Sequence, residues 1–96
     1  MAEEIDKKEI SEFPDIIGKK YFIRTVTYHL TGQVKKITGN MLILENAAWI
    51  ADSGRFMNAI KNGILKEVEP VDEAIVNINA ITDMFPWNHP LPRTQI

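Results

Sequence analysis

The sequence reads KYFIRTVTYHLTGQVKKITGNMLILENAAWI from residue 20 to residue 50, and this stretch decides the fold class. β-Branched and aromatic residues dominate it, and such residues favour strands that are buried on one face. Turn residues interrupt it at Thr31-Gly32 and at Thr38-Gly39-Asn40, since Gly and Asn accept positive φ at low cost. The pattern predicts three antiparallel strands, at 21–29, 33–37 and 41–50, joined as a meander.

After the third predicted strand, the spacing of apolar residues becomes that of a helix. Residues 54–62 are predicted to form a short helix, because three apolar residues recur on one helical face: Phe56, Met57 and Ile60. We expect Asp52 or Ser53 to cap the start of this helix. Gly63 is suited to the left-handed position after its end.

A residue composition typical of strands returns at 73–78 and 81–85, with only Asn79-Ala80 between the two segments. So short a gap suits the tight helical turn that joins the last two strands of small barrels. Five short strands with one helix between the third and fourth predict a mainly β fold, a small, strongly bent barrel. An open barrel of this kind leaves edges free to pair between subunits, so we expect a homo-oligomer.

The barrel is predicted to occupy residues 20–86. A charged segment at 1–19 precedes it, with a short helix expected before Pro14. A Pro-rich tail at 87–96 follows, which we expect to be extended and packed by Trp87 and Leu91.

The composition and charge of the chain limit which partners and which compartment can be expected. The chain has 96 residues, no cysteine and a net charge of −2. Residues 20–96 carry eight basic side chains against seven acids, and this near-neutrality argues against broad binding to polyanions. The charged N-terminus and the absence of an apolar run of about 18 residues favour a cytoplasmic protein without a membrane contact.

Catalytic and cofactor motifs are missing from the sequence. Its two histidines, His29 and His89, have no nucleophile at a recognised spacing, and we expect the first on the sheet surface and the second in a solvated tail. The glycines are spaced as turn markers rather than as a phosphate loop. Acids and histidines show no metal-ligand spacing, so no enzyme activity, cofactor or metal is predicted.

The strongest candidate ligand site lies where the third strand gives way to the helix. Unpaired backbone N–H groups and the helix dipole attract anions at such a start. Arg55 adds a forked donor for phosphate or carboxylate, and Trp49 offers a flat face to a base or ring. The candidate ligand-binding residues are Trp49, Asp52, Ser53 and Arg55. In the alternative interpretation Trp49 is a core residue, Asp52 a helix cap, and Arg55 a partner of Asp52 or Glu45.

A second candidate is a nucleic-acid face on the first two strands, made of Arg24, Tyr28, Lys35 and Lys36. Alternation along 21–29 places Arg24, Val26 and Tyr28 on one face, and basic and aromatic side chains together can bind single strands by stacking and charge. A solvated strand face is the alternative, because the domain carries few basic residues.

Four stretches resemble a family of small uncharacterised proteins of bacteria and phages: YHLTG at 28–32, LENAAWIADSGRF at 44–56, EVEP at 67–70 and ITDMFPW at 81–87. The resemblance covers about residues 21–92 and carries no assigned activity. The strand order also resembles the small five-stranded SH3/Sm-like barrels. The Sm-like fold implies a ring whose subunit contact joins 74–78 to 81–85. Sm-like proteins place their helix before the first strand, whereas the helix predicted here follows the third.

These observations favour a non-enzymatic, homo-oligomeric module that binds a small anionic ligand such as a nucleotide. In a phage setting such a module would sequester a nucleotide signal. One alternative is an Sm-like RNA-binding ring that uses the basic face of the first two strands. Another is a structural or protein-interaction subunit in which Trp49 and Phe56 are packed.

Overall fold

The computed structural model describes residues 13–96 and contains five strands, one α-helix and two short 3₁₀ helices. Residues 1–12, which hold most of the charged segment and the helix expected before Pro14, lie outside the described part. The elements in chain order are η1 (Phe13–Ile16), β1 (Lys20–Thr25), β2 (His29–Thr38), β3 (Met41–Asp52), α2 (Phe56–Asn62), β4 (Glu67–Asn77), η2 (Ile78–Ala80) and β5 (Ile81–Pro86).

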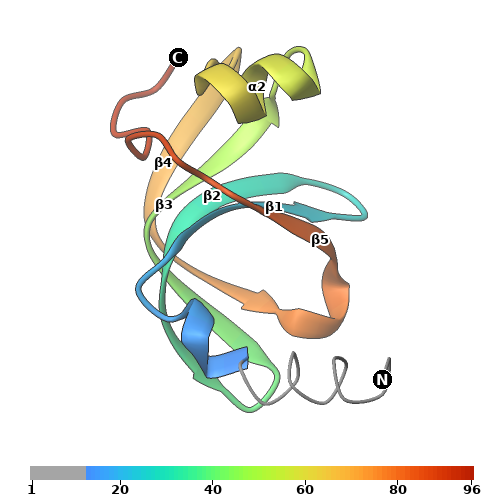
Figure 1. Ribbon diagram of the computed structural model, residues 1–96, viewed down its shortest axis with the longest axis vertical. Coiled ribbons are helices and arrows are strands. Elements are labelled where there is room, and N and C mark those ends of the chain that lie inside the picture. The colour runs from blue at the N-terminus through green and yellow to red at the C-terminus, as the bar shows by residue number, and fades with distance from the viewer. Residues whose placement is uncertain (1–12) are drawn as a thin grey trace, which may run out of the picture.

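The strands form one antiparallel sheet in the order β4-β3-β2-β1-β5. The sheet is strongly bent, and its two outer strands are joined through η2 without pairing to each other, so it is not closed (Figure 1). The prediction of a mainly β fold with five strands, a short helix after the third and a tight helical turn before the last is confirmed.

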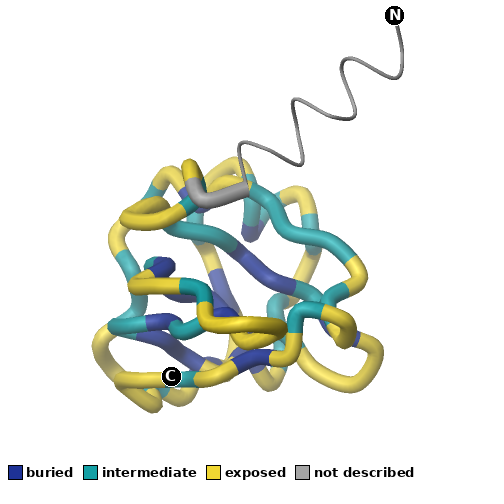
Figure 2. The backbone as a smooth tube through the Cα atoms, turned by 90° about the horizontal axis from the view of Figure 1, so that it is seen from below, coloured by how far each residue is buried: buried dark blue, intermediate teal, exposed yellow. Residues whose placement is uncertain are grey.

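Apolar side chains form two buried clusters, one on each face of the sheet. Figure 2 shows where the buried residues lie along the backbone. Adjacent residues of one strand go to different clusters, as the alternation of a strand requires. The first cluster lies under α2 and the tail and includes Phe22, Ala48, Ile50, Ala59, Leu65, Val68 and Trp87. The second fills the inside of the bend and includes Ile23, Leu30, Val34, Leu42, Leu44, Ala47 and Val76.

The first predicted turn was misplaced. β1 ends at Thr25 and β2 begins at His29, so the chain turns at 26–28 and not at Thr31-Gly32. The Thr25 hydroxyl makes this turn: it donates to the Tyr28 carbonyl at 2.8 Å and accepts from the Tyr28 N–H at 3.1 Å. Gly32 instead lies within β2, where a Cβ would stand 3.2 Å from Leu44 Cβ. The glycine permits close packing there rather than a turn.

The fourth strand begins six residues earlier than predicted, at Glu67 instead of 73. Val68 is buried between exposed Glu67 and Glu69, which is the alternation of a strand. Pro70 is tolerated because β4 is an edge strand, which does not need every N–H for the ladder. Positive φ at Asp72 and an irregular register with β3 mark the kink that follows.

The helix is shorter than predicted and starts at Phe56. Its N-cap position is Arg55, without a side-chain cap, so the expectation of a cap at Asp52 or Ser53 is wrong. Met57 was expected on the buried face of the helix but is 53% exposed, and Ala59 is buried there instead. Gly63 does adopt the left-handed conformation, with φ of 70° and its N–H bonded to the Ala59 carbonyl.

The tail crosses the first core and reaches the outer edge of β4 (Figure 1). Trp87 is buried and its indole N–H donates to the Pro90 carbonyl at 3.2 Å, while Leu91 packs against the same core, as predicted. At the end of the tail, Ile96 and Val68 exchange backbone hydrogen bonds in both directions.

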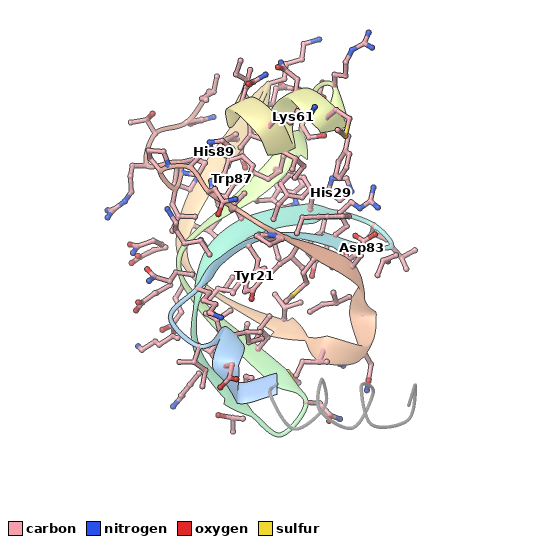
Figure 3. All side chains as sticks on the ribbon, viewed as in Figure 1. Tyr21, His29, Lys61, Asp83, Trp87 and His89 are labelled. Carbon is pink, nitrogen blue, oxygen red and sulfur yellow. The ribbon has the colours of Figure 1, made fainter. Side chains whose placement is uncertain are left out.

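His89 is half-buried and packed, whereas a solvated side chain was expected. Its Nε2 lies 2.8 Å from the Ile60 carbonyl at the end of α2, and its ring packs edge-on against Trp87 (Figure 3). The ring covers Gly63, where a Cβ would stand 2.7 Å from His89 Cγ. This contact fastens the tail to α2.

Candidate functional site

Trp49 lies near the end of β3 and is 39% exposed, whereas Trp87 is 2% exposed. Its neighbours across the sheet are Leu30 on β2 and Glu69 on β4. The fold therefore buries Trp87 in the core and leaves Trp49 partly exposed to solvent. A large ring exposed in this way is available for stacking.

The turn from β3 into α2 is built around Asp52. Its carboxylate accepts the Gly54 N–H at 2.8 Å, and its carbonyl accepts the Lys66 N–H at 3.0 Å. Gly54 has φ of 69°, which suits glycine. Ser53 is half-buried, and its hydroxyl lies 3.4 Å from the Gly54 carbonyl. Asp52 and Ser53 therefore shape the turn that presents Arg55.

Arg55 is exposed at the tip of this turn. Within residues 13–96 two ion pairs form, Arg24 with Asp83 and Lys35 with Glu73, and Arg55 belongs to neither. Because α2 has seven residues, its dipole adds little, and the positive charges beside the turn are those of Arg55 and of the exposed Lys66, whose Cβ would lie 3.7 Å from a Cβ at Gly54. All four candidate residues lie within positions 49–55, and Trp49 and Arg55 are both exposed. Strand alternation turns the Trp49 ring to the sheet face opposite that of Ala48 and Ile50, which pack under α2, while Arg55 stands at the start of α2.

The basic face predicted on the first two strands is not assembled as one strand face. Because β1 ends at Thr25, Tyr28 stands in the β1–β2 turn and not beside Arg24 on a strand. Lys35 is 3.5 Å from Glu73 of β4, and Lys36 is exposed. Arg24 forms an ion pair with Asp83 of β5.

Arg24 holds three elements together. Its guanidinium donates to both carboxylate oxygens of Asp83 on β5, at 2.7 and 2.5 Å. It also lies over the rings of Phe56 on α2 and Phe85 on β5, with the guanidinium carbon 4.8 and 5.2 Å from their centroids. Such cation–π contacts add to the ion pair.

The hydrogen bonds from Arg24 lower the pKa of Asp83 below its ordinary value, while partial desolvation opposes them. His29, which packs on Phe22 with ring centroids 5.5 Å apart, lowers the pKa of Asp83 further as a minor contribution. Sequence reasoning did not single out Asp83, because its partner is 59 positions away along the chain.

Three of the hollows on the described surface lie away from the turn. One of about 460 Å³ is lined by 18–21, Gln33 and 86–88, and one of about 380 Å³ lies along the kink of β3 and β4 beside Arg93. The third, of about 240 Å³, is apolar and opens at the η1 end of the inner core. None of these three hollows is lined by residues 49–55.

Comparison with known proteins gave no match to a family model, to a curated protein or to a solved structure. Over the described residues, none of the helices has the length and apolar character needed to cross a membrane. A search of the same residues for three neighbouring His, Cys, Asp or Glu side chains able to hold a metal ion found no group.

Proposed function

We propose that this chain is a non-enzymatic binding module that holds a small anionic ligand with a planar ring, such as a nucleotide, at the turn from β3 to α2. One observation carries the proposal: Trp49 is 39% exposed and Arg55, six positions later, takes part in no ion pair among the described residues. Stacking on the indole and pairing with the guanidinium are the two contacts that such a ligand needs.

The alternative in which this segment is only structural has less support. It requires Trp49 and Phe56 to be packed and Asp52 to cap the helix. Phe56 packs against the first core, but Trp49 is 39% exposed and the N-cap residue is Arg55. Asp52 instead acts as a positioning residue, since its hydrogen bond to the Gly54 N–H fixes the backbone that carries Arg55.

The proposal includes an SH3/Sm-like barrel that self-associates. The strand order and the 3₁₀ turn between β4 and β5 support this finer fold assignment. Among the described residues each outer strand has one edge without a paired strand, and backbone hydrogen bonds from the tail reach β4 at Val68. The contact implied by the Sm-like resemblance, 74–78 against 81–85 of a neighbouring subunit, uses the uncovered part of these edges.

Isothermal titration of the purified protein with a panel of nucleotides tests the ligand site. We expect Trp49→Ala and Arg55→Ala each to weaken the best nucleotide at least tenfold, because each removes one of two principal contacts. Tyr28→Ala is the matched control for Trp49, since both rings are 39% exposed. Lys61→Ala is the control for Arg55, since it removes a positive charge from the other end of α2.

Unchanged affinity in both site variants would refute the turn as the binding site. An RNA-binding ring, the alternative function, predicts instead that Tyr28→Ala and Lys36→Ala weaken oligonucleotide binding and that this binding falls steeply with salt. The pairing of Arg24 with Asp83 and of Lys35 with Glu73 gives that alternative less support.

A further inference from the structure

A basic hollow lies where the start of β1 meets the start of the tail. It encloses about 460 Å³, which is within the range of small-molecule sites. Its lining contains two lysines, Lys19 and Lys20, and no acidic residue, although the whole chain has a net charge of −2. Two like charges in one concave surface focus a positive potential there.

The backbone that carries the two lysines is fixed from both sides. The Lys19 carbonyl accepts the Val34 N–H at 2.9 Å, and the Lys20 carbonyl accepts the Trp87 N–H at 3.0 Å. At the rim, the Gln33 side chain donates to the Gly18 carbonyl at 2.8 Å. A hollow held in this way loses little conformational entropy when a ligand binds.

The ammonium groups have donors to spare. Lys20 Nζ donates to the His89 carbonyl at 2.6 Å, which orients the group and leaves two of its three protons. Lys19 is exposed, and neither lysine belongs to the two ion pairs of the described residues. Two ammonium groups match a phosphate monoester, which carries a charge of roughly −1.5 to −2 at neutral pH.

The rest of the lining suits an organic group. Tyr21 and Pro86 are neighbours across β1 and β5, and both line the hollow. Figure 3 labels Tyr21, which packs against the second core, and Trp87, which belongs to the first. The Tyr21 phenol is uncharged at neutral pH and keeps its donor, and burial raises its pKa further above the ordinary value of 10.0.

We propose that this hollow binds a small phosphate monoester, with the phosphate at Lys19 and Lys20 and the organic group against Tyr21 and Pro86. This goes beyond the function proposed above, because the site uses neither Trp49 nor Arg55. It joins β1 to the first residues of the tail, so the bound ligand stabilises the attachment of the tail to the sheet.

Phenyl phosphate and inorganic phosphate are the probes, followed by titration calorimetry and by amide shifts in ¹⁵N-labelled full-length protein. We expect shifts at 18–21 and Asn88, and tighter binding of phenyl phosphate than of inorganic phosphate. Lys19→Ala should weaken phenyl phosphate about tenfold. Lys36→Ala is the matched control, because it removes an exposed lysine of β2 outside the hollow, and affinity should stay within twofold.

Three results would overturn the proposal. The first is the absence of binding by either probe at millimolar concentration to the folded protein. The second is an equal loss in the Lys19 and Lys36 variants, which would reflect overall charge. The third is a loss in Arg55→Ala with none in Lys19→Ala, which would place the phosphate at the β3–α2 turn and support the function proposed there.

Discussion

At the scale of single residues, Thr31 has an unusual environment. It is fully buried in β2 between Phe22 of β1 and Ala48 of β3, and its hydroxyl has no hydrogen-bond partner among the described residues. A buried hydroxyl without a partner has lost its water hydrogen bonds without replacement.

Thr31→Val should therefore stabilise the protein, because it replaces the hydroxyl with a methyl group of similar shape. We expect the free energy of unfolding to rise by about 1 kcal/mol, as measured by urea denaturation. Thr25→Val serves as the contrast and should destabilise, since the Thr25 hydroxyl is engaged with Tyr28. A loss of stability in Thr31→Val would mean that the hydroxyl has an unseen partner, such as a buried water.

The roles of Gly32 and Asp83 could not be predicted from the sequence around them. A glycine next to threonine is typical of a turn, but Gly32 is needed because Leu44 approaches from another strand. Asp83 has no distinguishing neighbour in the sequence. Its role follows from its position opposite Arg24, because β5 pairs with β1. Both depend on contacts between strands, which local patterns do not contain.

At the scale of elements, the ion pair of Arg24 with Asp83 joins β1 to β5 and, through the Phe56 ring, to α2. Because the pKa of Asp83 is lower in the folded protein than in the unfolded chain, ionisation of this carboxyl stabilises the fold. That contribution is fully present above the unfolded pKa, near 3.8, and is lost as the pH falls through the folded value.

Asp83→Asn should accordingly be less stable than the natural sequence at neutral pH, and the difference should shrink as the pH is lowered below about 3.8. Urea denaturation of both proteins over a pH series measures this. Glu73→Gln provides the comparison, because its ion pair is longer, at 3.5 Å, and exposed on both sides. A difference that stays constant down to pH 2 would contradict the role given to Asp83.

The elements themselves were largely predictable. Strand composition and turn spacing gave the number and order of the strands, and Gly63 gave the end of the helix. The start of β4 was missed because Pro70 reads as a breaker, and only its place at the sheet edge makes it acceptable. The helix start was missed because Asp52 bonds the Gly54 N–H before the helix begins.

At the scale of the whole molecule, the sheet separates two cores, and within residues 13–96 no strand pairs with the outer edge of β4 or of β5. The tail and α2 cover one face, so the tail is part of the folded domain rather than an appendage. Residues 49–55 were proposed from the sequence, and the structure leaves their two key side chains accessible. The basic hollow had no sequence signal, because it combines the start of β1, one side chain of β2 and the start of the tail.

Native mass spectrometry of protein purified gently from its expression host tests the central claim most directly. The mass before and after denaturation should show a discrete oligomer that carries a small anionic compound, and Arg55→Ala prepared in parallel should carry none. Protein without a bound compound, or the same compound in equal amount on the Arg55→Ala variant, would contradict a ligand site at the turn from β3 to α2.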